Sequence, residues 1–133
     1  MSYYEDLFGE TGAGLLPARL VPISLEVAET LRERYLGIPE DYLQFLLELG
    51  WGEVGNENYM MYSGLIDAEE IYPGVGGLAG ILLFGDDFCG ICAGFDVRTW
   101  RVVEIDVECQ RPVDIAADFR TFIAATVARI AAW

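Results

Sequence analysis

A chain of 133 residues with 22 acidic side chains and 8 basic ones, all of them arginine, carries a formal net charge of −14 at pH 7. This charge argues against binding to nucleic-acid phosphates and to anionic membrane surfaces, both of which depend on Lys and Arg. The length fits one domain, and the lack of histidine excludes Ser–His and Cys–His catalysis.

The first 23 residues read as a lead-in that packs on a single domain formed by residues 24–133. They combine an expected short helix, a glycine-rich link and two prolines. The acidic start lacks the basic and apolar segments of a secretory signal, and no apolar run in the chain approaches the ~18 residues of a membrane span. We therefore expect a cytoplasmic protein.

Two helices are expected to open the domain. Ser24 is a good N-cap for a helix that runs to Tyr35. Pro39 fits the first turn of a second helix over residues 40–49, and Gly50 ends it. The apolar side chains of this second helix recur at i, i+3, i+4 and i+7 and make one face: Tyr42, Phe45, Leu46 and Leu49.

The remaining chain alternates short strands with two helices, and a glycine-rich loop covers residues 74–80. The expected order is a strand over 59–62, a short helix over 67–72, strands over 81–84, 90–96 and 100–107, and a final helix over 118–131. This order predicts an α+β fold with an antiparallel or mixed sheet of about four to six strands, flanked by helices.

Short motifs in a fixed order give the chain a family resemblance. They are Leu36-Gly37-Ile38-Pro39 with Asp41-Tyr42 and Phe45-Leu46, then Gly50-Trp51-Gly52, Phe84-Gly85-Asp86-Asp87 with Gly90, Gly94-Phe95-Asp96 with Thr99, and a helix with Phe119 and Phe122. In this order the sequence resembles the SMI1/KNR4 family, also called the SUKH superfamily, over residues 24–130.

The resemblance implies an α+β fold with an antiparallel sheet. It also implies a role as a bacterial immunity protein that binds and neutralises a polymorphic toxin, although some eukaryotic relatives regulate cell-wall signalling. Many nuclease toxins are basic, and the acidic charge of this chain favours a basic partner because complementary potentials speed association. General solubility explains the same charge equally well.

Three groups of residues are our candidates for a protein-binding surface. Trp51 lies between two glycines and is either an exposed interface anchor or a buried side chain that fixes its loop. The candidates are Trp51, Glu53 and Glu57 in one loop, Asp86 and Asp87 in a turn, and Glu104, Asp106 and Glu108 on a strand.

Alternation along the strand over 100–107 supports the last group. Side chains of successive residues point to opposite faces, so Glu104, Asp106 and Glu108 share a face with Trp100. If the apolar faces of this strand and the strand over 90–96 align, the opposite face is small, flat and acidic. A solvated outer face gives the same pattern without any binding role.

Catalytic and metal chemistry have weak support. Cys89 and Cys92 have redox-motif spacing but fall in an expected strand, and only Cys109 remains as a further thiol ligand. Acidic residues could hold Ca²⁺ or Mg²⁺, but the EF-hand pattern is absent and turn-forming aspartates explain Asp86 and Asp87 better. We expect no catalytic residue, no metal and no cofactor.

The sequence thus favours a non-enzymatic protein-binding domain, and in particular an immunity protein that covers a basic toxin. A regulatory interaction module without a toxin partner is the alternative, and a small hydrolase that uses paired carboxylates is the third hypothesis. The sequence leaves open whether the chain is a monomer or a dimer.

Overall fold

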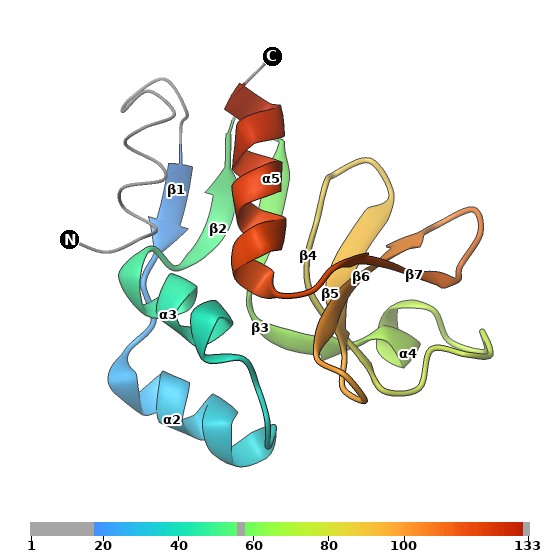
Figure 1. Ribbon diagram of the computed structural model, residues 1–133, viewed down its shortest axis with the longest axis horizontal. Helices are drawn as coiled ribbons and strands as arrows, with labels where there is room; N and C mark the ends of the chain where they lie inside the picture. The colour runs from blue at the N-terminus through green and yellow to red at the C-terminus, as the bar shows by residue number, and fades with distance from the viewer. Residues whose placement is uncertain (1–17, 56–57, 132–133) are drawn as a thin grey trace.

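The computed structural model describes residues 18–55 and 58–131, and within them seven strands form one sheet accompanied by four helices (Figure 1). The elements are β1 (Ala18–Val21), α2 (Leu25–Arg34), α3 (Glu40–Glu48), β2 (Trp51–Val54), β3 (Tyr59–Asp67), α4 (Ala68–Ile71), β4 (Ile81–Asp86), β5 (Ile91–Asp96), β6 (Arg101–Asp106), β7 (Pro112–Ala116) and α5 (Phe119–Ala131). The α+β class is confirmed.

Each strand pairs antiparallel with the next strand in the sequence, so the sheet is a meander in the order β1 to β7. The expected number of four to six strands is wrong because β1, β2 and β7 were missed. β1 lies inside the predicted lead-in, whereas the helix predicted near the N-terminus lies outside the described residues. β2 contains Trp51 and Glu53, which were predicted to lie in a loop, and no element was predicted for the residues of β7.

The four helices begin close to where the sequence predicts them. Ser24 accepts a hydrogen bond from the Val27 N–H at 3.2 Å, and Asp118 accepts one from the Thr121 N–H at 2.8 Å. Side-chain oxygens at these positions satisfy backbone donors that have no partner inside a helix. No helix in the described part of the chain is both long and apolar enough to cross a membrane.

β4 contains a β-bulge at Phe84, a residue of the main core. Leu83 pairs with Gly94 and Gly85 pairs with Ala93, so Phe84 is one extra residue on β4. Leu83 belongs to the core on the opposite side of the sheet, so ordinary alternation points Phe84 to this side. Phe84 is fully buried on the face that α3 and α5 cover, which we call the α5 face.

The opposite face, which we call the α4 face, has a second and smaller core. There Ala68 of α4, Tyr72 and Leu78 pack against the sheet residues Leu83 and Ile105. The sheet is therefore buried on both faces in its central strands. This explains why the sequence over 81–84 is continuously apolar instead of alternating.

Aromatic rings join the helices to the sheet on the α5 face. Phe119, the first residue of α5, has ring-centroid distances of 5.3 Å to both Tyr42 and Phe45 of α3. It lies 5.2 Å from Phe84 of β4 and 6.3 Å from Phe95 of β5. Edge-to-face and tilted contacts of this kind add to the free energy of burial.

We predict that Phe119→Ala lowers the free energy of unfolding by about 3–5 kcal/mol, because it leaves a cavity where α3, α5 and the sheet meet. Leu36→Ala is the control, since Leu36 is 86% exposed and its loss should change stability by about 0.5 kcal/mol or less. Urea unfolding followed by circular dichroism measures both. Equal midpoints for the two variants would contradict the central role of Phe119.

Candidate functional site

A groove lies on the α5 face between α5 and the β6–β7 hairpin. It consists of two hollows of about 230 and 310 Å³ that share Glu104 and Ile115. The inner hollow is lined by Glu104, Ile115, Ala116, Thr121, Phe122, Ala125, Thr126 and Arg129, and the outer one by Ile91, Glu104, Asp106, Cys109, Arg111, Val113 and Ile115. We call their combined surface the α5–β7 groove.

The strand register explains why Glu104 lies in the groove. Ala93 of β5 pairs with Glu104, and Glu104 pairs with Val113 of β7. Because paired residues point to the same face, Glu104 shares the α5 face with Ala93, and Phe95 shares it with Val102. The predicted alignment, which placed the acidic side chains opposite Ala93 and Phe95, is therefore wrong.

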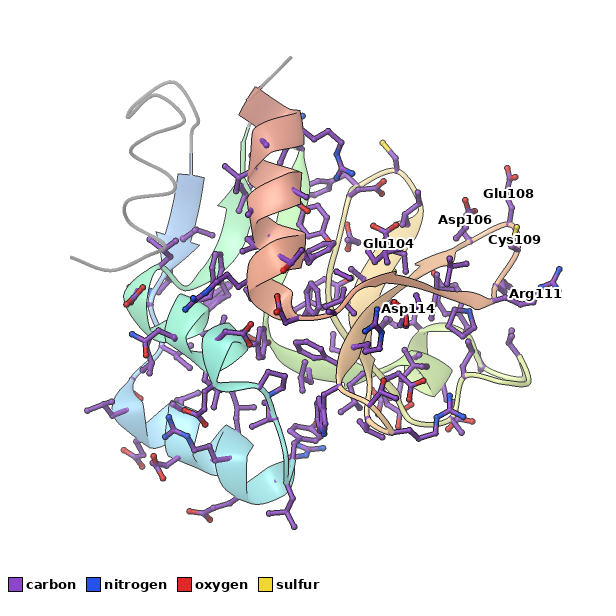
Figure 2. The ribbon with its side chains drawn as sticks, viewed as in Figure 1. Glu104, Asp106, Glu108, Cys109, Arg111 and Asp114 are labelled. Carbon is purple, nitrogen blue, oxygen red and sulfur yellow. The ribbon has the colours of Figure 1, made fainter. Side chains whose placement is uncertain are left out.

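Figure 2 shows Glu104 beside α5, whereas Asp106 lies farther toward the hairpin tip. Asp106 lines the outer hollow and accepts a hydrogen bond from the Glu108 N–H at 2.8 Å. Glu108 is exposed in the turn after β6, so its predicted place on the strand is wrong. Two of the three predicted strand carboxylates thus line the groove.

A bulge in β7 adds an apolar wall. Val103 pairs with Asp114 and Val102 pairs with Ala116, so Ile115 is one extra residue. Asp114 points to the α4 face, where it receives two hydrogen bonds from Arg101 at 2.5 and 3.1 Å. Ile115 stays on the groove side, 39% exposed, near Val113, which is 60% exposed.

Glu104 is the half-buried acid at the centre of the groove. Burial raises the pKa of Glu104, the positive charge of Arg129 opposes this effect, and the negative charge of Asp87 adds to it. Within the described chain neither Arg129 nor any other cation lies within ion-pair distance of Glu104. Its carboxylate is therefore partly desolvated without a direct countercharge.

Tyr59 lies beneath the same region. Its ring would overlap a side chain at position 85, because a Cβ on Gly85 would come within 2.8 Å of the ring. Burial raises the pKa of Tyr59, and the charge of Glu104 raises it further. The Tyr59 hydroxyl is buried and has no hydrogen-bond partner among the described residues.

Asp86 and Asp87 shape the β4–β5 turn. Asp86 accepts hydrogen bonds from the Tyr62 hydroxyl at 2.6 Å and the Phe88 N–H at 2.9 Å. Asp87 accepts from two backbone N–H groups of the turn, those of Cys89 at 2.8 Å and Ile91 at 3.0 Å. The turn-forming interpretation of both residues is confirmed. Of these two aspartates, only Asp87 contributes to the raised pKa of Glu104.

The predicted group around Trp51 lies far along the sheet. Trp51 begins β2, is partly buried and packs against the main core, so it is no exposed loop anchor. Glu53 is also in β2, which is separated from β7 by four strands, and Glu57 lies outside the described residues. Trp100 packs 5.7 Å from Phe95 in the core and does not border the acidic surface.

Sequence analysis missed the groove residues Val113, Ile115 and Arg129. Recognition of β7 would have required reading Pro112–Ala116 as a strand with a proline at its first position, which edge strands tolerate. The signal was the alternation of Val113, Asp114 and Ile115 shortly before Asp118, the N-terminal cap of α5.

The described residues contain no group of three or more His, Cys, Asp or Glu side chains that could hold a metal ion. Cys89 and Cys109 are exposed free thiols, and Cys92 is a buried one that accepts a hydrogen bond from the Tyr72 hydroxyl at 3.5 Å. Cys89 precedes β5, so its predicted place in a strand is wrong.

No protein-family model and no curated protein sequence matches the chain. The SMI1/KNR4 resemblance therefore stays a prediction that rests on the motifs given above.

Glu104→Gln should stabilise the protein at neutral pH, because the pKa of Glu104 is raised above its ordinary value of 4.5. Stability associated with the protonated form is fully present below that value and is lost as pH rises through the raised folded-state pKa. Solvent screens a half-exposed group, so the expected gain in Tm at pH 7 is small, about 1–3 °C.

Differential scanning calorimetry at pH 7 and pH 3.5 measures this effect, with Glu70→Gln on α4 as the matched control at an exposed site. The advantage of Glu104→Gln over wild type should shrink at pH 3.5. An advantage that is equal for both variants, or that grows in acid, would show that Glu104 is not held at a desolvated site.

Proposed function

We propose that the chain is a non-enzymatic protein-binding domain of the SMI1/KNR4 type, and that it acts as an immunity protein for a basic toxin. The observation that carries the proposal is the α5–β7 groove. It combines exposed apolar side chains, Val113 and Ile115, with the acidic side chains Glu104 and Asp106. Apolar surface bordered by charge is typical of surfaces that bind other proteins.

The charge distribution supports a basic partner. Asp87, Glu104, Asp106 and Glu108 lie in or beside the groove, and Arg111 and Arg129 are the arginines that line it. The excess of negative charge agrees in sign with the whole chain, whose net charge is −14. A partner of opposite charge is attracted over a distance that salt shortens.

One observation favours a hydrolase as the second candidate. Glu104, whose pKa is raised, and Asp106 lie two residues apart on one strand face, which separates their Cα atoms by roughly 7 Å. Two neighbouring carboxyl groups can act as an acid and a base. Incubation with generic ester, phosphate and glycoside substrates, with and without divalent metal, tests this candidate.

The immunity proposal predicts that this protein, used as bait at low and moderate salt, recovers one basic protein from lysate of the source organism in roughly equal molar amount. Expression of that basic protein alone should stop growth of a host cell, and co-expression of this chain should restore growth. Mass spectrometry and plating measure these outcomes.

A control protein of matched charge tests whether neutralisation of the toxin requires this chain or only a high negative net charge. Another cytoplasmic protein of similar size and net charge should neither recover the basic protein nor restore growth. A recovered partner that is harmless when expressed alone would favour the regulatory module instead. Recovery of nothing specific from a lysate that contains the partner would contradict both interpretations.

A further inference from the structure

Among the described strands β7 lies at the edge of the sheet, and its outer side is poorly suited to pairing with a strand from a partner. Pro112 at its start has no N–H to donate, and the bulge at Ile115 interrupts regular spacing. Asp114 adds charge and is held by Arg101. Proline, bulges and charge are the features that natural proteins use to prevent edge pairing. A partner is therefore expected to dock on the face of β6 and β7.

The face beside β7 offers a built receptor for one side chain. Val113 and Ile115 form an apolar border, while Thr126 and Arg129 of α5 form the opposite wall. Glu104 lies in both hollows, between these walls. A long side chain could therefore lay an apolar stem on Val113 and Ile115 and bring a polar end to Glu104.

The chemistry at the base of this receptor favours a cation. Glu104 lines both hollows, is half-buried and has no ion pair among the described side chains, whereas the buried Tyr59 hydroxyl near it lines neither hollow. A guanidinium is less strongly hydrated than an ammonium group, so it loses less on entering such a site. Its planar set of donors also matches a carboxylate.

We propose that the α5–β7 groove binds an arginine side chain of a basic protein partner, with its stem on Val113 and Ile115 and its guanidinium on Glu104. This inference rests on the proposed function and specifies the partner's chemistry. A second copy of this chain is a weaker occupant, because two chains that each carry −14 repel one another.

The first experiment uses small probes and needs no partner. N-acetyl-arginine amide is titrated into ¹⁵N-labelled protein, with N-acetyl-citrulline amide as the uncharged analogue of nearly identical shape. We expect saturable chemical-shift changes concentrated at Glu104, Val113 and Ile115. The citrulline analogue should bind about tenfold or more weakly, because it cannot form a charge-assisted hydrogen bond.

Two variants make the probe result specific. Glu104→Gln should weaken binding of N-acetyl-arginine amide by about tenfold, because it removes the carboxylate but keeps the shape. Glu70→Gln removes the same charge from an exposed site on α4 and should leave the dissociation constant nearly unchanged. Equal effects of the two variants, or shifts spread over all acidic surfaces, would overturn the proposal.

The second experiment uses the basic protein recovered by the bait. Glu104→Gln should weaken the complex about tenfold more than Glu70→Gln, and Val113→Ser more than Leu36→Ser, whose side chain is 86% exposed. Amide hydrogen exchange of β7 should show no new protection of the kind that strand pairing causes. New protection of β7 with an unchanged Glu104→Gln affinity would overturn docking on the face.

The two experiments separate the two proposals. Specific binding of the arginine probe without a toxic partner contradicts the immunity function and leaves the arginine receptor standing. A toxic partner whose affinity does not depend on Glu104 contradicts the arginine receptor and leaves the immunity function standing. Sedimentation that shows a dimer of this chain, dissociated by Glu104→Gln, would identify a second copy as the occupant and overturn the inference.

Discussion

The contact between Phe119 and Phe84 holds the two layers of this protein together. Phe84 points to the α5 face because it alternates with Leu83, which packs in the core on the opposite face. Phe119 begins α5, and its ring contacts both α3 and the sheet. This contact fixes where α5 crosses the sheet, and therefore which strands α5 covers and which it leaves open. The location of the groove follows from the packing of these two rings.

The groove is a boundary of the core. On the α5 face, Ala93 is buried, whereas Glu104 and Val113 in the same cross-strand row are half-buried and exposed, respectively. The α4 face of β6 is closed by a separate cluster that includes Val103 and Ile105. A strand whose α4-face side chains Val103 and Ile105 are buried supplies a rigid base for Glu104 and Asp106 on its other face.

Sequence patterns predicted the four described helices within one or two residues, because caps and apolar periodicity act locally. They missed β1, β2 and β7: residues 18–21 were assigned to the lead-in, Trp51 and Glu53 to a loop, and no element was predicted over 112–116, although pairing with neighbouring strands places all three segments in the sheet. The candidate site was predicted in part: Glu104 and Asp106 line the groove, while Trp51 and Glu53 lie on a distant strand. The acidic side chains were assigned to the wrong face of the sheet because the apolar sides of β5 and β6 were assumed to align. The observed register instead pairs Ala93 with Glu104. Register depends on turn geometry and bulges, which alternation does not reveal.

The meander order has a consequence for biosynthesis. Each strand pairs with its neighbour in the chain, so the sheet can grow in the order in which the residues leave the ribosome. The groove, however, is formed by β6, β7 and α5, which follow all the other described elements in the chain. A nascent chain that lacks α5 would leave Phe84 uncovered and the inner wall of the groove unbuilt. The groove therefore exists only once nearly all of the described chain has been synthesised.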